Sequence, residues 1–310
     1  MQLCQIRPVT ASFDEPNLIS SAGLIPVMHL ARRAGLGQLV TDKLSIGGGA
    51  GADAAAKVAS IIAGMITGAD SIDDLGVLRE GAVHKVMPGV KAPSTLGTFL
   101  RAFTFGHVRQ LGAVAAALLV TLAAMVTLLP ASLEAKAVTW LDVDDTMRET
   151  YGYFKEGVGY GYNKVKGLNA LLAMVSTAAS APIIVAHRLR KGPVSSARGA
   201  GKFLADAIAA ARRTGASAVI RCRLDSAFYN HKVIGAIRTA GAQFSVTARM
   251  DPAICKAIAN IDEARWVSIK YRQGDLRSRA AAVDLATRRS PRRPTRRSPP
   301  PPRPTRSPRG

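Results

Sequence analysis

The sequence contains little cysteine. Its 310 residues include only three, Cys4, Cys222 and Cys255, which form no Cys-x-x-Cys pair and no metal-ligand spacing. This excludes a disulfide-rich secreted module and a zinc ribbon, and it is typical of proteins of a reducing cytosol. A chain of this length buries a sizeable core without disulfide bonds.

Aromatic and acidic residues are also scarce. Aromatic residues make up 5% of the chain, which weighs against a surface built to stack the bases of single strands. The 21 acidic residues face 42 Lys and Arg, giving a formal net charge of +21. An excess of this size favours a polyanionic partner, either nucleic acid or an anionic membrane.

Much of the positive charge lies at the C-terminus. Residues 288–310 contain nine Arg and eight Pro, and their only apolar side chains are the prolines. Such a segment cannot form a core, so we expect it to be disordered. Two interpretations remain open: a basic arm that binds phosphates without sequence preference, or the product of a frameshift in GC-rich DNA.

One segment requires comparison with a membrane span. Residues 111–129 carry no charge, but they are short for a bilayer and rich in Ala, so we expect a buried helix of a helical domain. The first twenty residues include Asp14 and Glu15 and have no apolar run, which argues against a secretory signal. A membrane-associated protein remains a third alternative, and fractionation would test it.

The first part of the chain has the spacing of helices. Apolar residues recur every three or four positions in residues 25–36 and 54–67, and shorter helices are expected over 72–79 and 93–103. Helices joined by short turns are compatible with a helix-turn-helix DNA reader. Residues 47–53 are glycine-rich but lack the Gly-Lys-Ser/Thr of a phosphate loop, so we interpret them as a linker.

The pattern changes after residue 135. We expect strands at 137–145, 168–177, 182–189, 218–224 and 242–248, and helices at 201–213 and 230–239. The order β-β-β-α-β-α-β predicts a mixed sheet with an antiparallel half. The fold class is therefore α+β, a helical N-terminal region followed by a mixed β-sheet.

Carboxylates cluster near the predicted strand ends. Because strand residues alternate faces, Asp142 and Asp144 should point one way and Asp145 the other. Asp225 ends the fourth predicted strand. If the first and fourth strands are neighbours, Asp144 and Asp225 converge and could hold Mg²⁺ for phosphodiester chemistry. The alternative is that these aspartates only cap turns.

Several short motifs occur in a characteristic order. Together they resemble a bacterial insertion-sequence transposase of the DDE class, whose catalytic domain is ribonuclease-H-like, and the resemblance extends to about Tyr271. The motifs are Leu-Asp-Val-Asp-Asp-Thr at 141–146, Tyr-Gly at 151–152, Gly-Tyr at 161–162, Arg-Leu-Arg-Lys-Gly at 188–192, Arg-Leu-Asp-Ser-Ala-Phe-Tyr at 223–229 and Phe-Ser-Val-Thr-Ala-Arg at 244–249.

The resemblance implies roles for individual residues. Asp144 is the first catalytic acid, with Asp142 as the alternative, and Asp225 is the second. The two would bind Mg²⁺, in a two-metal site in intact relatives, and drive cleavage of DNA and strand transfer. A basic group would lie near DNA phosphates, although a solvated strand end explains it equally well; its members are Arg188, Arg190 and Lys191.

The resemblance also implies partners and a location. The helical region would recognise the terminal repeats of the element, so the partners are double-stranded DNA ends and target DNA rather than a small molecule or a membrane. Because two DNA ends must be brought together, a homo-oligomer is expected. The expected location is the bacterial cytoplasm, in association with the nucleoid.

The sequence departs from the family in one respect. The third acid of the family is a Glu on a later helix, and nothing in this sequence matches its motif. Glu263 lies on a helix expected over 252–264, which is too close to the fifth strand for that pattern. We therefore expect a truncated, inactive transposase with domains at 1–135 (helical, DNA-binding), 136–271 (incomplete catalytic domain) and 272–310 (Arg/Pro tail). The alternative function is a non-enzymatic basic nucleic-acid-binding protein.

Overall fold

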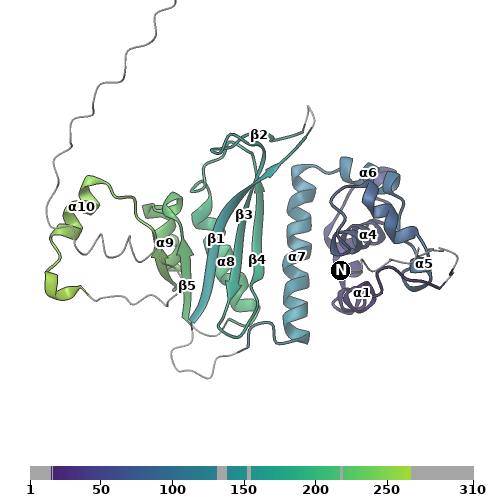
Figure 1. Cartoon of the computed structure of the whole chain (residues 1–310), viewed down its shortest axis with the longest axis horizontal. Helices are drawn as coiled ribbons and strands as arrows, with labels where there is room; N and C mark the ends of the chain where they lie inside the picture. Colours follow the sequence, from purple (N-terminus) through teal and green to yellow (C-terminus); the bar gives the residue numbers. More distant parts are fainter. Residues whose placement is uncertain (1–14, 16, 131–137, 152–154, 217–218, 267–310) are drawn as a thin grey trace, which may run out of the picture. The chain divides into compact units, whose positions relative to one another are not determined.

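The computed structural model describes residues 15, 17–130, 138–151, 155–216 and 219–266. The chain divides into two compact units, residues 1–250 and residues 251–310, and each is described by itself. The first unit contains a helical region and a β-sheet (Figure 1). The expected mixed α+β fold, with helices first and a mixed sheet after them, is confirmed.

The helical region is built from short helices. The long helix expected over 25–36 is interrupted at Gly35, whose φ of 82° lies in the left-handed region that glycine adopts without strain. The segment 72–79 forms a 3₁₀ helix rather than an α-helix. The elements are α1 (Leu24–Arg33), α2 (Leu36–Lys43), α3 (Gly48–Gly51), α4 (Ala54–Ile66), η1 (Asp73–Arg79), α5 (Val83–Val86), α6 (Pro93–Arg101) and α7 (Phe105–Met125).

A small core holds these helices together. Phe99 is 1% exposed and packs edge-on against Phe103, with ring centroids 5.1 Å apart. Lys57 is buried beside it, donates to the carbonyl of Ala50 at 2.9 Å, and lies 5.5 Å from the centre of the Phe99 ring. The buried charge is thus satisfied by a carbonyl and an aromatic face. The other buried members are Leu36, Val40, Leu44, Val58 and Val114.

Helix α7 contains the apolar segment that we expected to be a buried helix. The helix is present and packs against α2 and against strand β4 of the sheet. However, Val114 is its only fully buried residue, so the expectation of a buried helix is wrong for most of its length. Within the described residues α7 is also the one helix long and apolar enough to cross a membrane, which by length and composition alone is weak evidence for a span.

The strands follow one another along the chain in the expected order, with helices between the later ones. β4, β3 and β1 are antiparallel neighbours, and β5 and β6 continue beyond β1 in parallel, while the short β2 pairs with one end of β3. This is the mixed sheet with an antiparallel half that the sequence predicts, with β2 added. The strands are β1 (Val138–Glu149), β2 (Gly159–Tyr160), β3 (Lys166–Ser176), β4 (Ile183–Arg190), β5 (Val219–Leu224) and β6 (Gln243–Val246).

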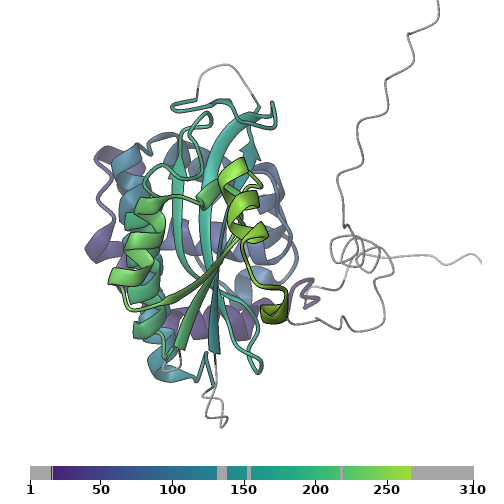
Figure 2. The same ribbon diagram turned by 90° about the vertical axis from the view of Figure 1, so that its left-hand side faces the viewer.

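Two helices cover one face of this sheet (Figure 2). α8 (Ala200–Arg213) and α9 (His231–Thr239) pack on each other and bury apolar side chains of the strands. Asn230 caps α9 by accepting from the backbone N–H of Val233 at 3.0 Å. The largest fully buried side chains are Leu141, Leu171, Phe203, Leu204, Ile208, Phe228 and Ile237.

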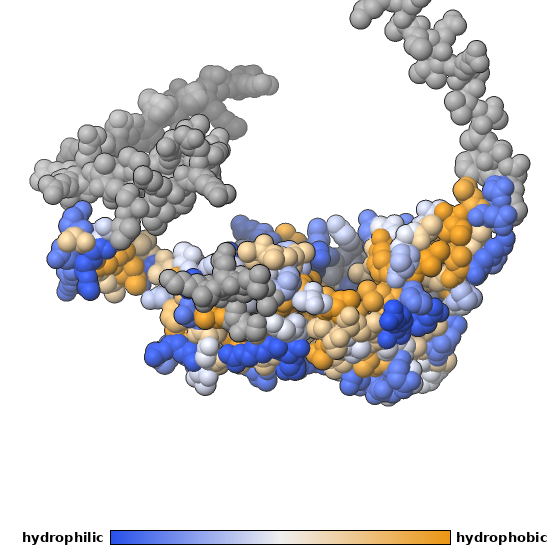
Figure 3. All heavy atoms as spheres, turned by 90° about the horizontal axis from the view of Figure 1, so that it is seen from below, coloured by the Kyte–Doolittle hydropathy of each residue, from blue (hydrophilic) through white to orange (hydrophobic). Residues whose placement is uncertain are grey.

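The opposite face of the sheet carries the alternate residues of the strands. On β3 every second residue is buried and the residues between them, such as Leu172 and Met174, are half-buried. Apolar side chains also reach the surface elsewhere, for example Ile25 and Leu30 of α1. The space-filling view accordingly shows hydrophobic residues interspersed with hydrophilic ones (Figure 3).

The second unit contains α10 (Pro252–Ala259) and η3 (Glu263–Arg265). Asp251 caps α10 through the N–H of Ile254, and Asp262 caps η3 through the N–H of Ala264. Glu263 was expected on the helix that begins at Pro252. That placement is wrong, because α10 ends at Ala259 and Glu263 begins the separate 3₁₀ turn. The Arg/Pro tail lies outside the described residues.

Candidate active site

The two candidate aspartates lie on neighbouring parallel strands. β1 and β5 pair in register from Val138 opposite Val219 to Val143 opposite Leu224. Asp144 and Asp225 are the next residues on the two strands, so they occupy matching positions at the end of the pairing. The adjacency that the sequence analysis posed as a condition is therefore met.

The position of Asp144 within its strand differs from expectation. β1 does not end at Asp145 but continues to Glu149, because β3 pairs with it antiparallel along this length. Asp144 thus lies within β1, opposite Leu172 of β3. On the other side of β1 the pairing stops where β5 ends, at Leu224.

The faces of the three neighbouring aspartates are as predicted. Leu141 and Val143 are buried on the helix-covered face, so Asp142 and Asp144 belong to the opposite face. Asp145 alternates back to the covered face, where its side chain is 6% exposed. Of the three aspartates, only Asp142 and Asp144 therefore lie on the face of the sheet opposite the helices.

Both candidate carboxylates are exposed and fixed by one backbone hydrogen bond each. Oδ1 of Asp144 accepts from the N–H of Asp145 at 2.8 Å. Oδ1 of Asp225 accepts from the N–H of Ala227 at 3.0 Å and so caps the short 3₁₀ turn η2 (Ser226–Phe228). Among the described residues no partner is recorded for Oδ2 of either carboxylate, so these two oxygens are available to a ligand.

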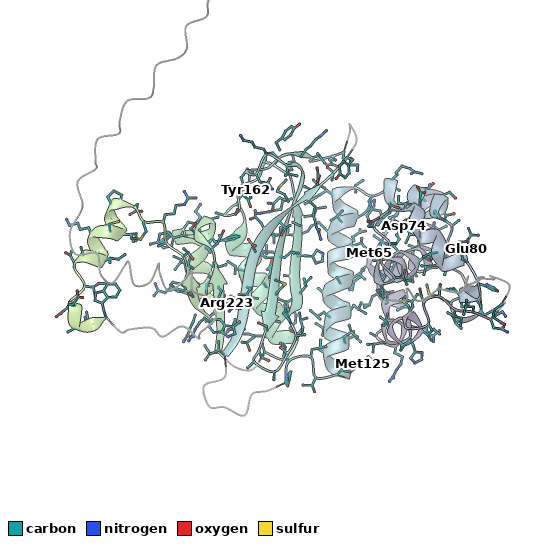
Figure 4. The ribbon with its side chains drawn as sticks, viewed as in Figure 1. Met65, Asp74, Glu80, Met125, Tyr162 and Arg223 are labelled. Carbon is teal, nitrogen blue, oxygen red and sulfur yellow. The ribbon has the colours of Figure 1, made fainter. Side chains whose placement is uncertain are left out.

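Asp142, the alternative first acid, has a different environment. Arg223 donates to its two oxygens from Nε at 2.5 Å and Nη2 at 2.6 Å, which forms a bidentate ion pair between β5 and β1. This bond raises the pKa of Arg223. The Arg223 guanidinium also lies 4.6 Å from the centre of the Trp140 ring, and Arg223 is marked in Figure 4. Asp142 is already neutralised, which makes Asp144 the better candidate for a metal ligand.

The arrangement partly fits a divalent cation. Hard cations such as Mg²⁺ take carboxylate oxygens and keep several waters, so two exposed aspartates can hold one. Within the described residues no group of three or more His, Cys, Asp or Glu side chains is arranged to hold a metal. The two aspartates therefore offer an incomplete ligand set of the right chemistry.

The three predicted phosphate-binding residues have different surroundings. Lys191 is exposed. Arg188 is 19% exposed and contacts Asp206 at 3.5 Å. Arg190 is 7% exposed, so its surroundings do not support the expected contact with DNA. The reason is that its guanidinium is fully engaged inside the fold.

The network around Arg190 was not predicted from the sequence. Arg190 pairs with Asp145 at 3.2 Å and donates from Nε to Asn169 at 2.8 Å. Asn169 and Ser196 in turn donate to Asp145, at 2.6 Å and 3.0 Å. The signal in the sequence is a polar residue at a core-facing position: Asn169 occurs two residues before the buried Leu171.

Cys222 lies on β5, beside the strand that carries Asp142. Cys222 is buried on β5, and burial together with the charge of Asp142 raises the pKa of its thiol to about 12. It is therefore a neutral thiol near pH 7 and a poor nucleophile.

Comparison with known families identifies the class of the protein. The chain matches the family described as Transposase DDE domain group 1 over residues 1–293, which include the helical region and the whole sheet. No curated protein matches the chain. Because the family match covers far more than half of the sequence, the chain belongs to the group 1 family of transposase DDE domains, and its function is that of a transposase.

Proposed function

We propose that the protein is a metal-dependent DNA transposase whose metal ligands are Asp144 and Asp225. The observation that carries the proposal is their matching position on the parallel strands β1 and β5, each with one oxygen free of recorded contacts among the described residues. The family membership supplies the reaction class.

The residues of the site have separate roles. Asp144 and Asp225 would hold Mg²⁺ at the end of the β1–β5 pairing. A cation held there would activate a water or a 3′-hydroxyl and stabilise the leaving oxygen in phosphodiester chemistry. Arg223 pairs with both oxygens of Asp142 and so removes that carboxylate from the free metal ligands.

The substrate is double-stranded DNA. We propose that the helical region, residues 1–135, recognises the terminal repeats, and that exposed Lys191 and partly exposed Arg188 contact phosphates. Because the reaction joins two element ends to a target, the working form is a homo-oligomer. The proposed location is the bacterial cytoplasm in association with the nucleoid.

We also propose that this chain has little or no activity. The family reaction uses three acidic residues that act as a unit, so two of them retain only a small part of the rate. The expected truncation would remove the third acid, and it stays a prediction. Reading the coding DNA beyond codon 271 in all frames tests it: another frame that continues as a Glu-bearing helical segment supports truncation, and the lack of one contradicts it.

The test of function compares metal dependence with DNA binding. Asp144→Asn and Asp225→Asn remove one negative charge each but keep the oxygen that accepts the backbone N–H. We expect both variants to bind duplex DNA as the wild type does and to lose the stabilisation by Mg²⁺ that the wild type shows in thermal unfolding, a readout that needs no catalytic activity. Asp42→Asn, an exposed residue of α2, is the control.

The alternative, a non-enzymatic nucleic-acid-binding protein, predicts a different result. In that case Mg²⁺ would have the same effect on the wild type and on all three variants. Family membership favours the transposase.

A further inference from the structure

A cavity of about 290 Å³ lies between α7, β4 and α8. It exists because the side of α7 that faces the sheet carries small residues, including Gly112 and Ala113, which leave space in front of the strand. Its volume is near the lower end of the range of small-ligand sites. This cavity is separate from the aspartate pair, which lies at the other edge of β1.

The charged residues that line the cavity are mostly positive. They are Arg109 of α7, Arg188 of β4, Arg213 of α8 and a single carboxylate among the described residues, Asp206 of α8. Asp206 is shared, since it contacts Arg188 at 3.5 Å and Lys202 at 3.3 Å. One shared carboxylate does not neutralise three guanidinium groups, so the cavity has an excess of positive charge.

Arg188 is held in place at the cavity. Its guanidinium donates to the carbonyl of Gly199 at 3.3 Å and lies 5.3 Å from the centre of the Phe203 ring. Burial lowers the pKa of Arg188, and the positive charge of Arg109 lowers it further. Arg109 and Arg188 line the same cavity, so their positive charges repel each other, and an anion between them would offset this repulsion.

We propose that this cavity binds a phosphate group, with Arg109 and Arg188 as its cationic ligands. Guanidinium groups match the oxygens of phosphate with two parallel hydrogen bonds, and a fixed Arg loses little freedom on binding. The phosphate is either part of the DNA backbone or a free phosphate ion. The first source rests on the proposed transposase function and extends it to the junction of the helical region and the sheet.

Thermal unfolding of the full chain tests the site, with inorganic phosphate as the probe and chloride at equal ionic strength as the reference. We expect phosphate to raise the midpoint of the wild type. Arg109→Gln should weaken phosphate binding by about tenfold or more, as expected for the loss of a charged hydrogen bond. Arg33→Gln removes the same charge from the exposed end of α1, outside the cavity, and should leave phosphate binding unchanged.

A second variant tests the cavity without changing charge. Ala113→Leu places a larger side chain in the cavity one helical turn from Arg109 and should abolish phosphate binding. No phosphate-specific stabilisation of the wild type, an equal response of Arg109→Gln and Arg33→Gln, or full phosphate binding by Ala113→Leu would each overturn the proposal.

Duplex DNA distinguishes the two sources of phosphate. If the cavity binds the DNA backbone, Arg109→Gln weakens DNA binding more than Arg33→Gln does, and free phosphate competes with DNA. If the ligand is a free phosphate, the two variants bind DNA equally. Asp144→Asn and Asp225→Asn should bind phosphate as the wild type does, so failure of the metal site and failure of this site are separate results.

Discussion

Three aspartates within four residues of β1 have three different environments. Asp142 is paired with Arg223, Asp144 is exposed, and Asp145 is buried with Arg190. Because side chains alternate along a strand, Asp145 lies on the other face from Asp142 and Asp144. Asp142 differs from Asp144 because its neighbour on β5 is Arg223. Only Asp144 keeps an oxygen available to a ligand on the open face.

The buried pair of Asp145 and Arg190 gives the first residue-scale prediction. Arg190→Ala leaves the Asp145 carboxylate buried with Asn169 and Ser196 but without a positive charge. Breaking a buried pair in this way destabilises a protein by about 3–5 kcal/mol. We expect urea unfolding of Arg190→Ala to show a decrease of this size in the free energy of unfolding.

Arg148→Ala is the matched control for Arg190→Ala. Arg148 lies on the same sheet and is exposed, so its loss should change the free energy of unfolding by about 0.5 kcal/mol or less. Equal effects of the two substitutions would contradict the structural role of Arg190.

Residue chemistry explains which parts of the site could be predicted. The matching positions of Asp144 and Asp225 could be predicted, because each directly follows the last paired residue of two neighbouring parallel strands. The role of Arg190 depends on Asn169 and on the backbone carbonyls of Ser196 and Arg198, which come from different segments. A run of basic residues in a sequence does not reveal such partners.

At the scale of elements, local sequence patterns predict that a helix or strand exists better than they predict where it begins and ends. The expected succession of strands and helices along residues 138–246 is confirmed, since alternation and turn residues mark each strand. The end of β1 was misplaced because pairing with β3, rather than local composition, extends the strand to Glu149. The helix expected over 25–36 was too long because a single glycine, Gly35, permits a turn with positive φ.

The turn after β4 gives a prediction at this scale. Gly192 is buried between the backbones of Gly159 and Gly167, and a Cβ added there would overlap both of their carbonyl oxygens. Gly192→Ala should therefore cost about 1–3 kcal/mol of stability, as overpacking does. Urea unfolding measures the loss.

Gly235→Ala is the control for this glycine. Gly235 lies in α9, where an added Cβ would meet no atom within 4 Å. Alanine is the better helix former, so this variant should be more stable by up to about 1 kcal/mol. Destabilisation by Gly235→Ala, or none by Gly192→Ala, would contradict this account.

At the scale of the whole molecule, the net charge of +21 agrees with the binding of DNA by a transposase. Nine of the arginines lie in residues 288–310. If this segment is a basic arm, it neutralises phosphates and releases counterions, and each phosphate neutralised adds about 0.9 to the salt slope of binding.

The salt dependence of DNA binding tests whether residues 288–310 act as a basic arm. Changing the nine arginines of residues 288–310 to Gln keeps the length of the chain and should lower the salt slope of duplex binding by up to about eight. Fluorescence anisotropy over a range of salt concentrations measures the slope. An unchanged slope would mean that the segment does not contact DNA.

The most direct test of the metal site is the binding of Mn²⁺, followed by electron paramagnetic resonance on the full chain. Because the readout is binding, it does not require catalytic activity. We predict that the wild type and Asp142→Asn bind Mn²⁺ and that Asp144→Asn and Asp225→Asn do not. Mn²⁺ binding that survives in both of the last two variants, or that is lost only in Asp142→Asn, would contradict the assignment of Asp144 and Asp225 as the metal ligands.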